Sequence, residues 1–478
     1  MSMHGSTCAC AVALLALGMA ADAGAGEPKL GTKPTIWEAK GGPADDKTIF
    51  AFGDAYRDFL SANKTEREVV ATATAMAEKA GFKRLDPAAP PAKLAPGAKL
   101  YYSVEGKILA LVVVGKRPIE EGFRVVGAHI DAVRLDLKQR PLFEDGNIAL
   151  LETHYYGGIK PYHWLSMPLA LHGVVIKRDG TRVDVRLGDD LADPVLVIPD
   201  LLAHLSGLAD DREGEEIPKE KLDVMVASRP DPKGGGVRGT VLTWLKTKYG
   251  VAEDDLESAE LEVVPASPAR DVGIDRAAVG GYGQDDRACS YATLRATLEM
   301  GTPDHTAIAL LVDKEEIGST GVTGMDSVFL PTVASTLLRA ALGDKATDHV
   351  LRTTFTRSMA LSADVTLAAD PLYPDLYDAK NVAYFGAGPS FESASHSELA
   401  AHLRDLLLKA RVTFQTGEFG KVVSSKSDAG TILPFITRTG VPGMNLSIPL
   451  LSMHAPFEIV SKADLYHGYL AYKAFLED

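Results

Sequence analysis

The 478-residue chain contains little cysteine and less positive than negative charge. Its cysteines are Cys8, Cys10 and Cys289. If the first two are removed with a leader, neither an intrachain disulfide nor a cysteine metal site is possible. The net charge of −14 argues against nucleic acid or an anionic membrane as the main partner. No segment after the first residues is apolar for long enough to span a bilayer. The composition, 46% apolar and 24% charged, is typical of a globular protein with room for two or three domains.

The N-terminal residues differ from the rest of the chain. An apolar stretch runs from about Cys8 to Ala20, and Ala21-Asp22-Ala23 has the small-x-small form of a cleavage site. The positively charged start of a signal peptide is weak here, since it holds His4 but no Lys or Arg. We predict a signal peptide at 1–23 and therefore a periplasmic or secreted protein. The alternative is a cytoplasmic protein with an unstructured start.

The remaining chain alternates between helix-like and strand-like segments, with one long interruption. A helical pattern extends from Asp45 to about Lys83, and the valine-rich runs KILALVVVG and FRVVGAHID predict buried strands. After about residue 279, strand and helix patterns alternate again. This order predicts an α/β sandwich in two parts, 24–135 and 279–478.

The interruption, residues 136–278, has a different character. Its segment LALHGVVIKRDGTRVDVRLG alternates and turns at Asp179-Gly180, which predicts a β-hairpin. Two further segments, GLADDREGEEIPKEK and RPDPKGGGVRG, are polar and rich in turn residues, so they predict exposed loops. We therefore predict an inserted β-rich domain.

Candidate metal ligands follow several of the predicted strands. His129 and Asp131 in GAHID are two residues apart, so an imidazole could bind a metal while the carboxylate holds the ring in place. Asp285 and Asp286 precede a predicted helix, where an aspartate is also a common N-cap. Taken singly, each of these residues is better explained as part of a loop or cap.

The adjacent carboxylates Glu315 and Glu316 follow another predicted strand, in DKEEIGSTG. Like charges side by side repel each other unless a cation compensates them. Asp364 in LSADVTLAADP and His454 in LLSMHAPFE complete the set. Together these segments hold the ligands of a dinuclear zinc site with a bridging carboxylate. In such a site one glutamate of the pair would bind metal and the other would transfer a proton.

Eight segments together resemble the aspartyl aminopeptidase/aminopeptidase I family of dinuclear zinc exopeptidases, over nearly all of the chain after the leader. They are GAHIDAVRLDL, ETHYYGGIKPYHWLSMPLALHGVV, IPDLLAHL, DDRACS, DKEEIGSTG, SADVTLAADPLY, GEFGKVVSSKSDAGTI and LSMHAPFEIVSKADLY. The resemblance implies a mixed-sheet α/β/α sandwich of the zinc exopeptidase type, interrupted by an inserted β-rich dimerisation domain. It also implies that the protein removes the N-terminal residue from peptides with a free N-terminus.

The resemblance implies a metal role for each matching ligand. His129 and Asp364 would ligate one zinc ion. Glu316 and His454 would complete the second, and Asp285 would bridge the two. Two Zn2+ per subunit are therefore expected, with Co2+ or Mn2+ as possible substitutes. The choice of Asp285 rather than its neighbour as the bridge comes from the family pattern alone.

Catalytic and subunit roles follow from the same resemblance. Glu315 would be the general base and then the general acid, and Asp131 would orient His129. The family's tetrahedral dodecamers, built from dimers, imply a homo-oligomer. His204 in IPDLLAHL matches a histidine that reaches into the partner's active site. Its alternative role is that of an ordinary core or interface histidine.

The sequence differs from the acid-specific branch of the family in a segment that bears on substrate specificity. Asp370-Pro371-Leu372 stands where the acid-specific branch has His-Pro-Asn, and the following GAGPSFESASHSELA offers no Lys or Arg for a substrate carboxylate. The chain is thus closer to the aminopeptidase I branch, which favours neutral or broad N-terminal specificity. The alternatives are an Asp/Glu-specific aminopeptidase, a co-catalytic zinc carboxypeptidase or deacylase, a non-catalytic oligomeric scaffold, and a protein whose acidic residues only cap helices or face water.

Overall fold

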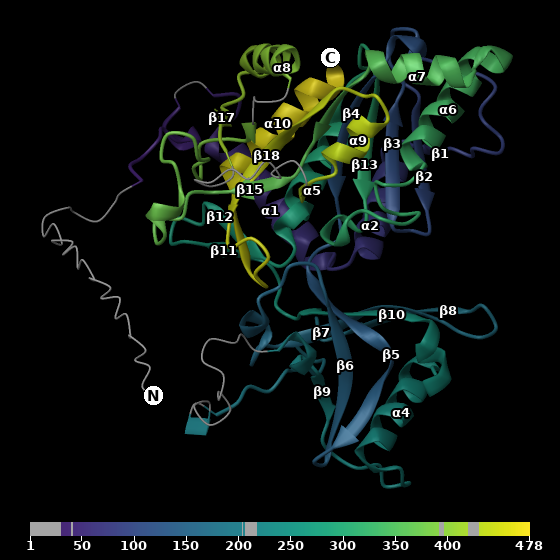
Figure 1. The fold of residues 1–478 in the computed structure, drawn as a ribbon, viewed down its shortest axis with the longest axis vertical. Helices are drawn as coiled ribbons and strands as arrows, with labels where there is room; N and C mark the ends of the chain where they lie inside the picture. The colour runs from purple at the N-terminus through teal and green to yellow at the C-terminus, as the bar shows by residue number, and fades with distance from the viewer. Residues whose placement is uncertain (1–29, 40–41, 203, 206–217, 392–395, 419–429) are drawn as a thin grey trace, which may run out of the picture.

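The computed structural model describes residues 30–39, 42–202, 204–205, 218–391, 396–418 and 430–478. The predicted signal peptide and most of the polar segment 207–221 lie outside these residues. The chain forms two lobes, a larger one around a 13-stranded sheet and a smaller one around a six-stranded sheet (Figure 1). Among the helices in the described ranges, none is long and apolar enough to cross a membrane.

The larger sheet has parallel strands at its centre. β4 is parallel to β13 and β14, and β14 is parallel to β18. In order across the sheet the main strands are β1 (Lys83–Arg84), β2 (Lys99–Val104), β3 (Ile108–Val113), β13 (Thr306–Val312), β4 (Phe123–His129), β14 (Met359–Ser362), β18 (Gly443–Leu451), β19 (Glu458–Ser461), β12 (Ala278–Gly281) and β11 (Arg270–Val272). Three short strands extend this order: β15 (Val365–Leu367) and β16 (Ser390–Phe391) pair with β18, and β17 (Gln415–Thr416) pairs with β16.

Helices cover both faces of this sheet, because its central strands are apolar on both faces. In β13, Ala309 and Leu311 face one core, while Ile308 and Leu310 face the other. The first core is covered by α1 (Asp46–Ala62), α2 (Glu66–Lys79), α5 (Gln284–Glu299), α8 (Ser397–Lys409) and α10 (Lys462–Glu477). The second is covered by α6 (Phe329–Leu342), α7 (Asp348–Arg357) and α9 (Leu433–Arg438). The predicted three-layer α/β/α sandwich is confirmed.

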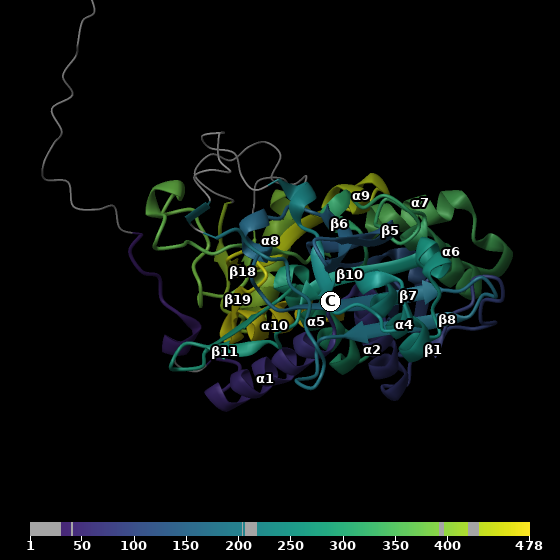
Figure 2. The ribbon, with the colours of Figure 1, turned by 90° about the horizontal axis from the view of Figure 1, so that it is seen from below.

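The smaller sheet is antiparallel throughout. Its strands are, in order, β8 (Arg182–Leu187), β7 (Leu169–Ile176), β10 (Ala259–Pro265), β5 (Arg134–Asp145), β6 (Ile148–Tyr156) and β9 (Val224–Ala227). β7 and β8 form the predicted hairpin, with Ile176 opposite Arg182. Viewed from below, this sheet lies in front of the larger lobe (Figure 2). Since β4 ends at His129 and β5 begins at Arg134, the carboxyl edge of the larger sheet faces the smaller lobe.

The smaller lobe also contains a helix, α4 (Gly236–Tyr249). Its residues Val237, Val241 and Leu245 recur at helical spacing and are buried in the same core as the second sheet. The segment RPDPKGGGVRG, predicted as an exposed loop, therefore turns into a helix at Gly236. That prediction was wrong for its last four residues, because the apolar partners that define the helix lie further along the chain. The limits predicted for the inserted domain stay a prediction.

Candidate metal centre

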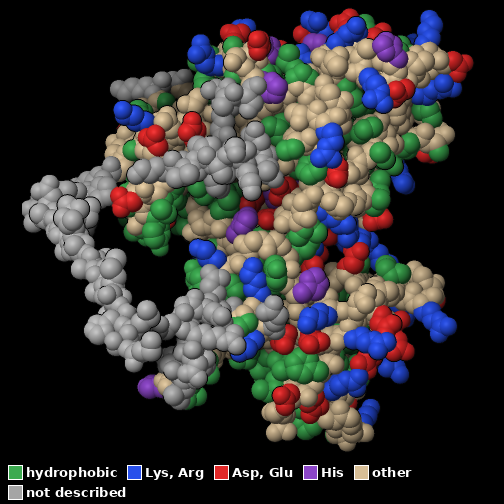
Figure 3. Space-filling view, in the orientation of Figure 1, with side chains coloured by type: hydrophobic (Ala, Val, Ile, Leu, Met, Phe, Trp, Pro, Cys, Tyr) green, Lys and Arg blue, Asp and Glu red, His purple; other side chains and the backbone are tan. Residues whose placement is uncertain are grey.

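The predicted ligands lie at the carboxyl edge of the larger sheet. His129 is the last residue of β4, and Asp364 lies between β14 and β15. Glu315 and Glu316 begin a single 3-10 turn, Glu315–Ile317, shortly after β13. Because these strands are parallel, their carboxyl ends meet at one edge of the sheet. Residues far apart in the sequence are thereby brought together at the waist between the lobes, where acidic and histidine side chains are visible (Figure 3).

Asp285 and His454 reach the same edge from a helix and a loop. Asp285 lies in the first turn of α5, where it and Asp286 have non-helical dihedral angles and share a cis peptide bond. The N-cap of α5 is Gly283, and the helix has no side-chain cap. The interpretation of the aspartate pair as a simple helix cap is therefore wrong. His454 follows β18 with a φ of +64°.

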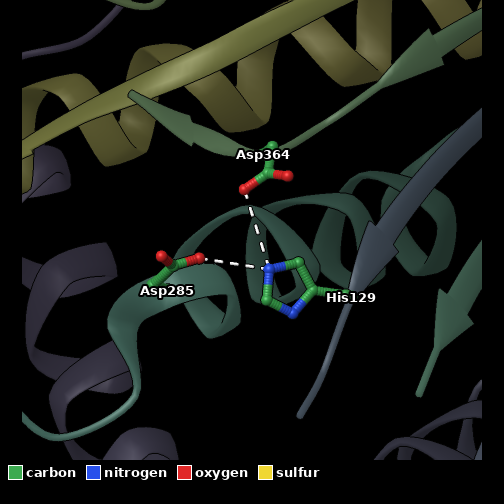
Figure 4. A group of neighbouring side chains, drawn as sticks. All are labelled: His129, Asp285 and Asp364. Carbon is green, nitrogen blue, oxygen red and sulfur yellow. Dashed lines mark hydrogen bonds and ion pairs between the residues drawn. The ribbon is translucent and has the colours of Figure 1, made fainter. Parts of the chain in front are cut away.

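The first ligand group consists of His129, Asp285 and Asp364. His129 Nε2 lies 3.1 Å from Asp285 Oδ1 and 3.7 Å from Asp364 Oδ1, and the three side chains point toward one another (Figure 4). All three residues are buried. The other ring nitrogen, Nδ1, lies 3.1 Å from the carbonyl oxygen of Asp131. Nε2 is therefore the nitrogen presented to the carboxylates.

The second ligand group consists of His454, Asp285 and Glu316. His454 Nε2 lies 3.2 Å from Asp285 Oδ2 and 3.5 Å from Glu316 Oε2. His454 Nδ1 lies 3.1 Å from the carbonyl oxygen of Gly158. Within each group the ligand atoms lie within 4.8 Å of one another. Asp285 thus belongs to both groups and presents one carboxylate oxygen to each histidine.

These donor atoms fit zinc, which binds imidazole nitrogen and carboxylate oxygen. Each group offers one imidazole and two carboxylates. In each histidine, Nδ1 is occupied by a carbonyl oxygen, which is the usual way to orient a metal-binding Nε2. Glu316 Oε1 is buried without a hydrogen-bond partner among the described residues. A buried carboxylate oxygen in that state is suited to a cation.

The cluster attracts positive charge. Burial raises the pKa of Glu315 to about 8, and the charge of Asp364 adds to this effect while His129 opposes it. Burial disfavours the charged imidazole of His454, but its hydrogen bond to Asp285 and the negative charges of Glu316, Asp285 and Glu458 together outweigh burial and raise the pKa of His454 to about 10. The positive charge of a protonated histidine partly neutralises the neighbouring carboxylates. Divalent cations bound between the carboxylates would supply this positive charge in place of the protons.

Asp131 contacts one residue of each ligand group, His129 and Glu316, and is fully buried. Its Oδ1 lies 3.3 Å from His129 Nδ1 and accepts a hydrogen bond of 3.1 Å from the Glu315 N–H. Its Oδ2 accepts hydrogen bonds from the Glu316 N–H at 3.2 Å and from the Tyr156 hydroxyl at 2.9 Å. Asp131 therefore contacts the backbone of the glutamate pair as well as the histidine that the sequence assigned to it.

Glu458 is a residue that the sequence analysis did not single out. Its Oε1 accepts a hydrogen bond of 2.8 Å from the His454 N–H. Its Oε2 accepts hydrogen bonds from the N–H groups of Gln284 at 2.6 Å and Asp285 at 3.1 Å. The buried Glu458 thus fixes the backbone of two ligands from different elements. The available signal was its place four residues after His454, in SMHAPFE.

One further aspartate, Asp286, and one further histidine, His204, lie outside both ligand groups. Asp286 is fully buried, and its Oδ2 accepts a hydrogen bond of 3.3 Å from the His129 N–H. Asp285, rather than Asp286, is the aspartate that faces both histidines. His204 is exposed and belongs to neither ligand group. Its role toward a partner subunit stays a prediction.

The fold and this geometry can be compared with known proteins. A family model described as "Aminopeptidase I zinc metalloprotease (M18)" matches residues 59–476. The chain belongs to the M18 family of zinc metallo-aminopeptidases. A probable M18 family aminopeptidase 1 from Clostridium acetobutylicum is 43% identical to this M18 chain over 448 residues, which are 90% of this chain and 96% of that protein. The crystal structure of an M18 aminopeptidase from Thermotoga maritima has a TM-score of 0.85 and 36% identity, covering 93% of this chain and 99% of the other.

M18 membership confirms the resemblance, the zinc exopeptidase fold and the enzyme class predicted from the sequence. The chain is a zinc metallo-aminopeptidase, which disfavours the carboxypeptidase, deacylase and silent-scaffold alternatives. A more distant M18 fold is the S. cerevisiae mApe1 dodecamer, with a TM-score of 0.73 and 23% identity over 90% of this chain and 97% of the other.

Proposed function

We propose that this M18 enzyme removes single N-terminal residues from peptides with the help of two zinc ions, one in each ligand group. His129 and Asp364 would hold one ion, and His454 and Glu316 the other. The observation that carries the proposal is the position of Asp285, whose Oδ1 and Oδ2 face different histidines at 3.1 and 3.2 Å. A carboxylate in that position is suited to bridge a dinuclear centre.

Glu315 is the residue proposed to move the proton. Bound zinc ions would polarise the peptide carbonyl and lower the pKa of a water molecule. Glu315 belongs to neither ligand group, yet its Oε2 lies 4.0 Å from His129 Nε2. A carboxylate that is free of the metal ligand set can accept a proton and return it. Glu315 would take the proton from the attacking water and deliver it to the amine of the leaving peptide.

We further propose neutral or broad N-terminal specificity. The segment 370–377, which follows β15, contains no Lys or Arg. It exposes three apolar side chains, Leu372, Tyr373 and Leu376. The high identity to a relative named aminopeptidase 1 supports the same branch. The second candidate is specificity for N-terminal Asp or Glu, which would need a cationic partner for the substrate side chain.

A homo-oligomer with the architecture of a tetrahedral dodecamer is proposed as the working form, with the dodecameric yeast neighbour as support. In this assembly the exposed His204 would reach the active site of a neighbouring subunit. Measurement of the mass in solution tests the assembly. Export after removal of residues 1–23 also stays a proposal, and N-terminal sequencing of the mature protein tests it.

The activity is tested with metal-replete protein on anilides of Leu, Lys, Ala, Asp and Glu, with Glu315→Gln as the control variant. We expect cleavage of the Leu or Lys substrates, loss of cleavage with a chelator, and loss in the variant. N-acetylated versions of the same substrates should remain uncut. Preference for Asp or Glu would overturn the specificity, and cleavage of the acetylated substrates would overturn the aminopeptidase mechanism. A metal content far from two per chain would overturn the dinuclear centre.

A further inference from the structure

The smaller lobe touches the metal centre at the end of β6. Tyr156 is the last residue of that strand, and its hydroxyl donates a hydrogen bond of 2.9 Å to Asp131 Oδ2. Two residues later, the carbonyl oxygen of Gly158 lies 3.1 Å from His454 Nδ1. The segment 156–158 therefore contacts Asp131 and also His454, a member of the second ligand group. It comes from the same chain and does not need a partner subunit.

The hydroxyl of Tyr156 completes the hydrogen bonding of Asp131. A carboxylate offers about four acceptor positions. In Asp131, one acceptor position faces His129 Nδ1 at 3.3 Å, and two accept from the N–H groups of Glu315 and Glu316 at 3.1 and 3.2 Å. The fourth acceptor position faces the Tyr156 hydroxyl. Asp131 is fully buried, so no solvent is available to replace the phenol.

Tyr156 is itself fixed by Arg134, which lies directly opposite it on β5. The Arg134 guanidinium lies 3.8 Å from the centre of the Tyr156 ring. Its charge is compensated by three carboxylates, Asp136 at 2.7 Å, Glu262 at 3.3 Å and Glu66 at 3.6 Å. These contacts come from both lobes, since Glu66 begins α2. The phenol therefore has a defined position relative to the larger lobe.

Tyr156 is suited to act as a permanent donor. Burial raises its pKa far above the ordinary value for tyrosine, and the neighbouring Asp131 adds to this effect. Its hydroxyl therefore keeps its proton throughout the range in which enzymes work. The hydrogen bond to Asp131 consequently has one direction, from Tyr156 to the carboxylate.

We propose that Tyr156 is a positioning residue of the active site. Through Asp131 it holds the backbone of the Glu315–Glu316 pair and the ring of His129 in the arrangement that binds zinc and moves the proton. The inference rests on the proposed function. It gives the smaller lobe a part in the active site of its own chain, in addition to any role in subunit contacts.

The test compares Tyr156→Phe with Tyr155→Phe. Tyr155 is the preceding residue of β6, is 46% exposed, and stacks with Lys219 at 4.2 Å. Both substitutions remove one hydroxyl from the same strand. Zinc affinity is measured by competition with a chromogenic chelator, and kcat and KM are measured with a Leu-anilide. We expect Tyr156→Phe to lower zinc affinity and kcat about tenfold and to leave KM unchanged, because Asp131, the partner of His129, would lose a hydrogen bond that holds it in place. Tyr155→Phe should match the wild type.

Thermal unfolding of the metal-free proteins separates positioning from stability. If Tyr156→Phe only lowers the melting temperature and keeps wild-type zinc affinity and kcat, the positioning role is overturned. If the wild type binds no zinc, or Glu315→Gln keeps full activity, the proposed function fails together with this inference. Should Tyr156→Phe not fold, Arg134→Lys takes its place. That variant keeps the phenol and the positive charge but removes the planar group over the ring, and unchanged zinc affinity and kcat in it would also overturn the proposal.

Discussion

Gly157 provides a sensitive test of how closely the smaller lobe approaches the metal centre. Its φ is +74°, and a β-carbon placed on it would lie 2.7 Å from Val133 Cγ1 and 3.1 Å from Glu316 Oε2. Carbon atoms in contact normally lie about 3.5–4.0 Å apart. Gly157→Ala therefore requires a shift of roughly 1 Å between the end of β6 and its neighbours. A misplacement of this size lowers the rate of an enzyme by on the order of 100-fold.

The positive φ of Gly157 adds a second effect, a loss of stability, which a control variant can separate from the steric effect. An alanine in this conformation costs about 1–2 kcal/mol of stability. Gly146→Ala has the same kind of strain, since Gly146 has a φ of +54° in the turn between β5 and β6, but a β-carbon there meets nothing within 4 Å. We expect both variants to unfold at lower temperature, and Gly157→Ala alone to lose kcat/KM and zinc affinity. Equal kcat/KM for the two variants would refute the reasoning.

Three further predictions concern the site itself. Glu315→Gln should keep its zinc and lose about 1000-fold in kcat, because an amide cannot carry the proton; metal analysis beside steady-state kinetics checks this, and loss of zinc would contradict the assigned role. Asp285→Asn should reduce bound zinc below two per chain and lower activity more than about 100-fold, since the bridge loses its charge; a variant that retains two zinc ions and its rate would contradict the bridge. Glu458→Gln should weaken zinc binding about tenfold, because an amide nitrogen would then face a backbone N–H of His454 or Asp285; unchanged affinity in a chelator competition would argue against this support.

The elements of the larger lobe could be predicted because their signals are local. β13 is apolar in every residue after Thr306 and is bounded by polar residues, and α6 begins and ends where its apolar periodicity does. The pattern of α4 was harder to recognise, since glycines precede it and its apolar face has meaning only against the second sheet. Short-range patterns therefore predicted the sandwich better than the lobe inserted into it.

In the candidate metal centre, too, some features could be predicted from local sequence and others depend on tertiary contacts. His129, Asp285, Glu315 and Asp364 could be listed from the sequence because strand ends followed by metal-binding side chains are visible in it. Their arrangement could not, because the choice between the two adjacent aspartates depends on which carboxylate points at both histidines. That geometry arises from the irregular first turn of α5.

Residue types and their order predicted the sandwich fold and a set of candidate zinc ligands, because both depend on periodicity and on the chemical nature of single side chains. The peptidase chemistry was predicted from the resemblance of eight segments to a known family. Tertiary contacts were needed to assign Glu458 and Tyr156, whose hydrogen-bond partners Asp285 and Asp131 are far away in sequence. The role of a buried carboxylate or phenol depends on its hydrogen-bond partner in the folded chain. Local sequence patterns do not show which distant residue that partner is.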